Sequence, residues 1–170
     1  MSDASGAAQL LSTTESFGHN MRVTNRLIQR DLGARLGRMG LNLGQWYALR
    51  ALWDGDEITQ IELAQRSGFA GPAMVSAVRA LLGMGLVTRH RPSDDKRKYV
   101  IKLTEKGWAA RTPALAMAVE ANTIALQGIA PDDVATCLRV LQKAHVNLAQ
   151  AAQDNSVGLD TVDALLFQLS

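Results

Sequence analysis

The sequence has little of several features that mark specialised classes of protein. Its 170 residues include one cysteine, Cys137, which excludes an internal disulfide framework and is compatible with a reducing compartment. No apolar run approaches the ~18 residues that cross a bilayer. No basic residue precedes Arg22, whereas a signal peptide begins with positive charge. Because 47% of the residues are hydrophobic and 20% are charged, we expect a globular, cytoplasmic protein without a membrane segment.

Residues that carry metal or catalytic chemistry are also scarce. Three histidines, His19, His90 and His145, are far apart in the chain and form no pair at metal-ligand spacing. No nucleophile lies in a recognisable arrangement with a base. Cys137 falls in a late amphipathic segment, which is typical of a buried structural cysteine. We therefore predict no enzyme activity, no cofactor and no metal site.

Positive charge is concentrated in one segment of the chain. The net charge is +2, yet residues 85–111 hold eight lysines and arginines against three acidic residues. Residues 112–170 hold two basic residues against six acidic ones. A local field of this size attracts a polyanion, but a well-solvated surface can carry the same charge. Charge alone therefore leaves both interpretations open.

Capping motifs and apolar periodicity predict a mainly helical chain. Ser12 and Glu15 have the spacing of a capping box, in which each side chain satisfies an otherwise orphan backbone donor. A long amphipathic helix should follow and end near Gly37 or Gly40. Its apolar residues recur at spacings of four and seven: Phe17, Met21, Ile28, Leu32 and Leu36. A second helix should open with the capping pattern of residues 42–45.

Two short helices with a tight turn between them form a helix-turn-helix pattern. Thr59 and Glu62 make a further capping box, and the helix that they open stops at Gly68. The next helix begins at Pro72, because proline is tolerated in a helix's first turn, and closes at residues 83–85.

The period then changes from helical to alternating, which predicts a β-hairpin. Residues 86–90 form its first strand, residues 91–95 its turn and residues 98–103 its return strand. The two faces of the return strand consist of alternating residues: Tyr99, Ile101 and Leu103 on the buried side, and Lys98, Val100 and Lys102 on the other.

Helices should fill the rest of the chain. Thr104 can cap the first of them, and Pro113 should kink it or mark its effective start. Breaks at residues 128–131 and 154–158 separate it from two further apolar helices, the last over residues 159–169. The order of elements is that of a winged helix-turn-helix flanked by helical arms.

Five short motifs, in order and spacing, resemble those of the MarR family of bacterial transcription regulators. The motifs are Gln45-Trp46, Leu63-Ala64, Gly85-Leu86-Val87-Thr88-Arg89, Asp95-Lys96-Arg97 and Leu103-Thr104-Glu105-Lys106-Gly107. The resemblance runs from about residue 15 to about residue 150. It implies a mainly α fold, in which a winged helix-turn-helix domain with a small β-hairpin wing is flanked by N- and C-terminal dimerisation helices. The corresponding regions are 1–40 for the N-terminal tail and first dimerisation helix, 41–103 for the DNA-binding lobe, and 104–170 for the C-terminal dimerisation helices.

The resemblance also implies a homodimer that binds a palindromic operator on double-stranded DNA. A helix in the major groove can read base edges, and a basic loop can enter the minor groove. The candidate DNA-binding residues are Arg66, Pro72, Ala73, Ser76 and Arg79 on the helix-turn-helix, and Arg89, Arg91, Asp95, Lys96, Arg97 and Lys98 on the hairpin. In the family, the residue that Asp95 matches pairs with the arginine two positions on and holds it towards DNA. Many members carry serine and threonine where this chain has Pro72 and Ala73, so apolar contact with thymine methyl groups is expected there.

The family commonly releases DNA when it binds a small aromatic acid or phenol. Trp46 and Arg50 lie one helical turn apart and can hold an aromatic carboxylate by stacking and a forked hydrogen bond. His19, Arg22 and Arg26 form a stripe on the first helix that could supply further donors for a carboxylate or for the phosphates of a coenzyme A thioester. The other interpretation is a core tryptophan with a snorkelling arginine, and a solvated stripe. We predict a ligand-responsive repressor; the alternative is a constitutive DNA-binding protein without an effector.

Overall fold

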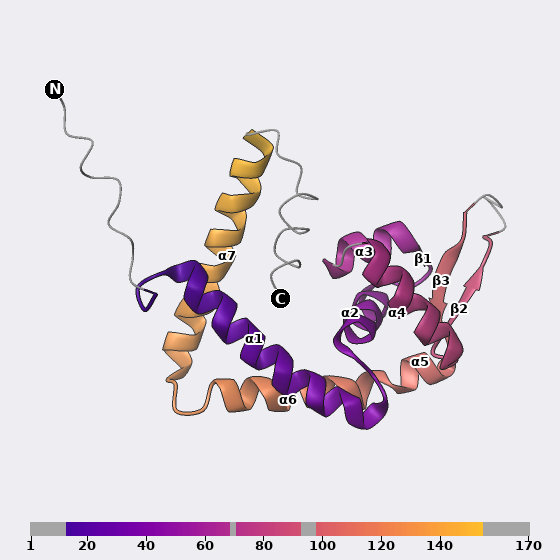
Figure 1. Cartoon of the computed structure of the whole chain (residues 1–170), viewed down its shortest axis with the longest axis horizontal. Coiled ribbons are helices and arrows are strands. Elements are labelled where there is room, and N and C mark those ends of the chain that lie inside the picture. The colour runs from indigo at the N-terminus through magenta and orange to yellow at the C-terminus, as the bar shows by residue number, and fades with distance from the viewer. Residues whose placement is uncertain (1–12, 69–70, 93–97, 155–170) are drawn as a thin grey trace.

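In the computed structural model, which describes residues 13–68, 71–92 and 98–154, the chain begins with one long helix, α1 (Phe17–Leu36) (Figure 1). Ser16 caps this helix, because its Oγ accepts the backbone N–H of His19 at 3.3 Å. The predicted cap at Ser12 is therefore wrong, since the helix starts beyond it, and Ser12 itself lies outside the described residues. A short 3-10 helix, η2 (Gly37–Met39), ends α1 where the sequence predicts.

A lobe of three helices and a small sheet follows. Its helices are α2 (Leu43–Asp54), α3 (Gln60–Ser67) and α4 (Gly71–Gly83), and its strands are β1 (Ile58–Thr59), β2 (Val87–His90) and β3 (Val100–Leu103). Both predicted capping boxes are present: Asn42 and Gln45 open α2, and Thr59 and Glu62 open α3. Gly68 ends α3 with a left-handed φ of 69°, a conformation that favours glycine. The helix-turn-helix prediction is thus confirmed at both of its helices.

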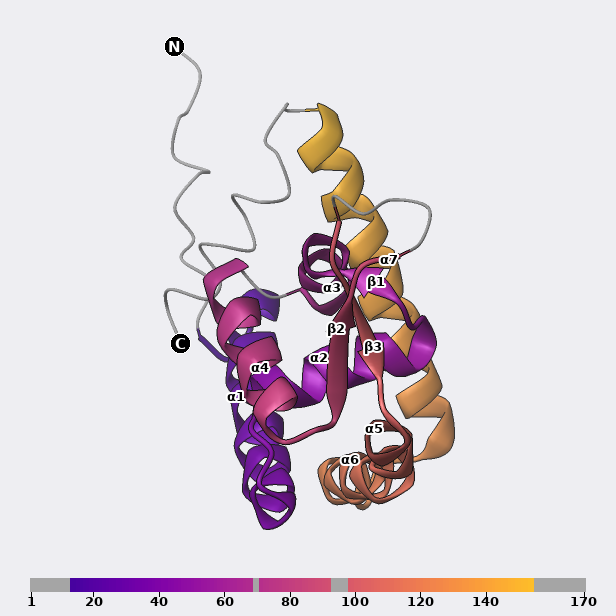
Figure 2. The same ribbon diagram turned by 90° about the vertical axis from the view of Figure 1, so that its right-hand side faces the viewer.

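The sheet has the order β1-β3-β2, with both pairs antiparallel (Figure 2). The pairing of β2 with β3 confirms the hairpin, but β1 was not predicted, because two residues show no periodicity. A long-range hydrogen bond helps to hold β1 in place: a carboxylate oxygen of Asp56 accepts the backbone N–H of Leu103 at 2.9 Å.

Two residues of the predicted return strand differ from the predicted alternation of buried and exposed side chains. Val100 is only 7% exposed, because it sits between Thr59 of β1 and His90 of β2. Tyr99 is 40% exposed, because it precedes the strand and lies beyond the end of β1. Ile101 and Leu103 are buried as predicted.

The core lies inside the lobe and continues into the flanking helices. Its fully buried large side chains are Leu36, Leu49, Leu52, Leu63, Met74, Leu81, Val87 and Ile101. Ala114 and Ala121 of the next long helix, α6 (Arg111–Ala125), belong to the same cluster. Arg35 of α1 donates to Asp31 at 2.6 Å and forms an ion pair with Glu120, which ties α6 to α1.

Two more helices complete the described chain. Thr104 caps α5 (Glu105–Ala109) as predicted, and its hydroxyl oxygen accepts the N–H of Gly107 at 3.0 Å. Helix α6 starts two residues before Pro113, which confirms that this proline marks a helix start. Gly128, with φ of 79°, turns the chain into α7 (Pro131–Asp154). Within the described ranges, no helix is long and apolar enough to span a bilayer. The predicted last helix, 159–169, lies outside the described residues.

Candidate nucleic-acid interface

Helix α4 presents a mixed apolar and polar face to solvent. Its opposite face is buried through Met74, Ala77, Val78 and Leu81, so the remaining residues must point outward. Pro72, Ala73, Ser76 and Arg79 are exposed, as expected for residues that read DNA. The Ser76 hydroxyl donates to the carbonyl of Pro72 at 3.3 Å. Val75 is also exposed and belongs to this face, although the sequence analysis did not name it as a DNA contact.

Arg66 does not join this face. A Cβ added to Gly55 would meet its guanidinium, so the Arg66 side chain lies against the turn between α2 and β1. Glycine at position 55 leaves the space that this contact requires. Arg66 remains exposed, but its guanidinium lies against the turn at Gly55 rather than beside Ser76 and Arg79.

The end of the hairpin strands nearest the loop brings together two predicted arginines and one tyrosine. Arg91 donates from Nη2 to the hydroxyl oxygen of Tyr99 at 2.7 Å. The guanidinium carbons of Arg89 and Arg91 lie 3.9 Å and 4.6 Å from the centroid of the Tyr99 ring. Sequence reasoning missed Tyr99, because alternation assigned its side chain to the buried face of the return strand. Asp95, Lys96 and Arg97, the predicted tip, lie outside the described residues, and Lys98 is exposed beside them.

Part of the positive charge of this region is used within the fold. Lys102 forms an ion pair with Glu57; the ammonium lowers the pKa of Glu57, and the carboxylate raises the pKa of Lys102. Lys106 donates from Nζ to the backbone carbonyl of Met84 at 2.7 Å. In the described part of the hairpin, Arg89 and Arg91 are exposed and form no ion pair with a described carboxylate, and Lys98 is exposed beside them.

The predicted ligand-binding residues form two separate groups. Trp46 is only 3% exposed and packs edge-on against Trp53, with ring centroids 5.8 Å apart. Arg50 is exposed, and its guanidinium carbon lies 5.9 Å from the Trp46 ring.

The other group is the stripe on α1. His19 and Arg22 approach each other at 3.5 Å, and Arg26 is exposed one turn further on. These residues lie on the first turns of α1, whereas α2 packs near its last turns (Figure 1). One chain does not bring the two groups together.

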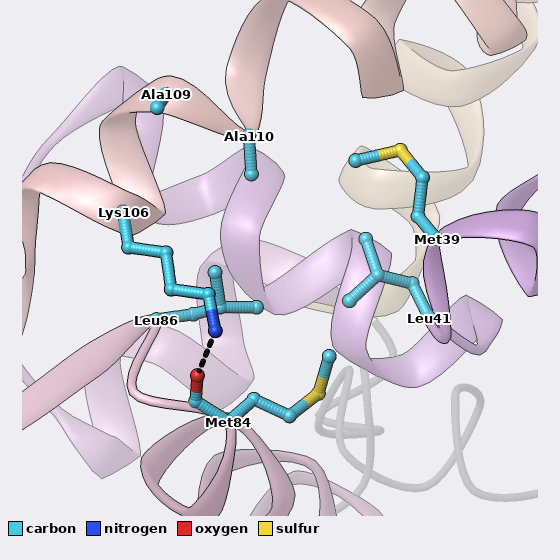
Figure 3. Close-up of a pocket in the computed structure, with 7 residues that line it drawn as sticks. All are labelled: Met39, Leu41, Met84, Leu86, Lys106, Ala109 and Ala110. Atoms are coloured by element: carbon cyan, nitrogen blue, oxygen red, sulfur yellow. Dashed lines mark hydrogen bonds between the residues drawn. The ribbon is translucent and has the colours of Figure 1, made fainter.

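A hollow of about 340 Å³ opens where η2, the α4–β2 turn and α5 meet (Figure 3). It is lined by Met39, Leu41, Met84, Leu86, Lys106, Ala109 and Ala110. The lysine is its only charged group, and Figure 3 shows that this side chain reaches the Met84 carbonyl along one wall. None of the five predicted ligand-binding residues lines it.

Two further features concern reactive side chains. Cys137 is exposed on α7, so the prediction of a buried structural cysteine is wrong for the single chain; α7 packs too loosely on the lobe to cover it. Among the described residues, no three histidine, cysteine, aspartate or glutamate side chains are placed to hold a metal ion.

Comparison with known proteins agrees with this geometry. A sequence model described as the MarR family matches residues 41–99, which run from just before α2 to just before β3. The transcriptional regulator PA3341 is 32% identical over 79% of this chain and 99% of its own, with a TM-score of 0.71. A probable transcriptional regulator from Pseudomonas aeruginosa is 25% identical over 78% of this chain and 99% of its own, with a TM-score of 0.70.

A more distant structure shares the fold. BpsR of Bordetella bronchiseptica, whose DNA binding is regulated by 6-hydroxynicotinic acid, is 18% identical over 75% of this chain and 97% of its own. Its TM-score is 0.69.

Proposed function

The chain belongs to the MarR family of DNA-binding transcriptional regulators, and from this premise we propose that it is a homodimeric repressor of a palindromic operator. We propose further that a small aromatic acid, a phenol or a coenzyme A thioester of such an acid releases it from DNA. Members of the family are transcriptional regulators rather than enzymes. The observation that carries the proposal is the exposed face of α4, which lies beside the arginine-bearing hairpin (Figure 2).

DNA reading is assigned to α4 in the major groove and to the hairpin on the backbone and minor groove. Pro72, Ala73 and Val75 offer apolar contacts to thymine methyl groups, while Ser76 and Arg79 offer hydrogen bonds. Removing one specific contact should cost about 1–3 kcal/mol of binding free energy. Arg97→Ala should therefore weaken operator binding and leave the fold and the dimer intact. An unchanged affinity at physiological salt would remove Arg97 from the interface.

The dimer is proposed because α7 packs little against the other described helices and strands of the chain. From residue 131 to residue 152, none of its side chains is buried. Leu138 is 54% exposed and Leu148 is 70% exposed. Exposed large apolar side chains on α1 and α6, Met21, Leu27, Val119 and Ile124, extend the apolar surface. Monomers rarely expose this much apolar surface, and a second copy would cover it.

Two-fold symmetry connects the dimer to the operator. Two recognition helices related by a two-fold axis read two half-sites about one helical turn apart, so the operator should be palindromic. Removing residues 156–170, which the sequence analysis assigns to the interface, should give monomers or aggregates. A truncated chain that stays a tight dimer would place the interface on α1, α6 and α7 alone.

The effector proposal rests on Arg50 beside Trp46 and on the regulation of BpsR by an aromatic acid. Because His19, Arg22 and Arg26 lie away from Arg50 in one chain, the proposed site needs the first helix of the second copy. The burial of Trp46 favours the second candidate function, a constitutive DNA-binding protein, because a buried ring offers no open wall.

One titration separates the two functions. The protein is bound to DNA fragments selected from its own genome, and benzoates, cinnamates and their coenzyme A thioesters are added. Arg50→Ala should raise the ligand concentration needed for release without changing operator affinity, whereas Arg38→Ala, an exposed arginine on η2, should leave both unchanged. If no compound releases DNA, the constitutive function stands; if Arg50→Ala responds normally, the site lies elsewhere.

A further inference from the structure

Tyr99 holds two arginines on one exposed ring at the loop end of the hairpin strands. The hydroxyl of Tyr99 accepts from Arg91 at 2.7 Å, and both guanidinium groups lie over the ring, at 3.9 Å for Arg89 and 4.6 Å for Arg91. Aromatic faces attract cations, and arginine stacks on them particularly well. The ring is therefore the element that organises the two charges.

The strand register explains why these three side chains meet. Arg89 pairs with Ile101 and His90 with Val100, and the same register continued by one residue beyond the strands sets Arg91 opposite Tyr99. Side chains alternate between the faces of a strand, which puts residues 89 and 91 on the face of residue 99. The strand register thus brings the three side chains to one face, and the hydrogen bond and ring contacts join them there.

Arg89 and Arg91 place two positive charges on one aromatic ring. Two guanidinium groups on one ring repel each other, and among the described residues no carboxylate forms an ion pair with either of them. A hollow of about 240 Å³ lies beside the cluster and is lined by Thr59, Gln60, Ile61, Arg89, Lys98, Tyr99 and Ile101. Lys98 adds a third cation at its edge. An anion placed here would be held by several cations and would relieve their mutual repulsion.

We propose that Tyr99 is a positioning residue that holds Arg89 and Arg91 as a clamp for a phosphate of the DNA backbone. This proposal rests on the DNA-binding function and on the placement of the hairpin against DNA proposed above. A free arginine side chain loses rotamer freedom when it binds a phosphate, whereas stacked arginines have already lost part of it. Tyr99 thus strengthens DNA binding without itself carrying charge.

The test is a double-mutant cycle in the full chain, with a DNA duplex selected from the protein's own genome as the probe. Tyr99→Leu should weaken binding about tenfold, and Tyr99→Phe, which keeps the ring but loses the hydrogen bond to Arg91, about threefold. In a chain that already carries Arg89→Ala and Arg91→Ala, Tyr99→Leu should have no further effect. Trp108→Leu, at an exposed aromatic residue on α5, is the matched control and should bind normally.

The salt dependence of binding supplies a second readout. Tyr99→Leu should lower the slope of log affinity against log salt by about 1, as loss of one phosphate contact does, although the charge of the protein is unchanged. Melting temperature and dimer mass should stay as in the wild type. If Tyr99→Leu weakens binding equally with and without the two arginines, Tyr99 acts on DNA or on the hairpin directly, and the clamp is refuted.

Two variants on α4 test the proposed docking on DNA separately from the clamp. If Ser76→Ala and Arg79→Ala leave DNA binding unchanged, as well as Tyr99→Leu, the proposed docking of α4 and the hairpin is wrong. If those variants bind weakly while Tyr99→Leu and the Arg89→Ala/Arg91→Ala chain bind normally, only the clamp is wrong.

Discussion

Gly107 is the position where a single added methyl group should do most damage to the fold. A Cβ at this position would overlap the backbone carbonyl oxygen of Leu86 and lie 3.0 Å from Cδ2 of Leu103. The Leu86 carbonyl also accepts the backbone N–H of Thr104 at 3.1 Å, and the Gly107 carbonyl accepts the indole N–H of Trp53 at 3.1 Å. Because the obstacle is backbone, α5 must move away from β2 and strain these hydrogen bonds.

The effect of Gly107→Ala on the free energy of unfolding is the sum of two losses and one gain. Overpacking of a close contact costs about 1–3 kcal/mol, and weakening two hydrogen bonds adds about 1 kcal/mol each. Alanine is favoured over glycine inside a helix by about 1 kcal/mol, which offsets part of this. We expect a net loss of about 3 kcal/mol in the free energy of unfolding, or roughly 6–12 °C in melting temperature for a chain of this size.

Gly33→Ala is the matched control. An added Cβ there would lie 3.7 Å from Cγ of Leu43, which is ordinary van der Waals contact, and Gly33 lies within α1. This change should stabilise the protein by about 0.5–1 kcal/mol. Both variants are compared with the wild type by urea unfolding at one protomer concentration, because dimerisation shifts apparent stability. Equal stability of Gly107→Ala and the wild type would refute the close approach of α5 to β2.

Three further predictions concern the pH response, the sheet and the dimer. Glu57→Gln should lower the free energy of unfolding at neutral pH but not in acid. Because Lys102 lowers the pKa of Glu57, the ion pair stabilises the fold above the unfolded pKa of Glu57, and this stabilisation is lost as pH falls through the folded pKa. Urea titrations at both pH values measure the difference. Asp56→Ala leaves the N–H of Leu103 without its acceptor and should destabilise the protein by about 1–3 kcal/mol in the same assay. Leu148→Glu should shift the molar mass towards the monomer in light scattering; an unchanged mass would remove α7 from the interface.

Much of the helical structure could be predicted because its signals are local. The capping boxes at Asn42 and Thr59 and the cap at Thr104 each join residues three positions apart, so the sequence contains both partners within one turn. The exposed face of α4 follows in the same way from its helical period. The first helix shows the limit of such signals, because Ser12 and Ser16 both offer a cap and only the structure selects Ser16.

Local periodicity also predicted part of the candidate site. Alternation predicted that Arg89 and Arg91 belong to the hairpin, but it assigned Tyr99 to the buried face. Burial on a small sheet depends on which neighbour extends over each position, and β1 covers Val100 but ends before Tyr99.

The sequence by itself determined where the helices and the hairpin lie, which residues cap α2, α3 and α5, and which family the chain resembles, because these depend on neighbours within a few positions. Only the tertiary structure decided how distant segments meet. It paired β1 with β3, turned Arg66 onto Gly55, buried Trp46 against Trp53 and pressed Gly107 against Leu86. These contacts join residues that no local period connects, and the packing of one shared core selects them.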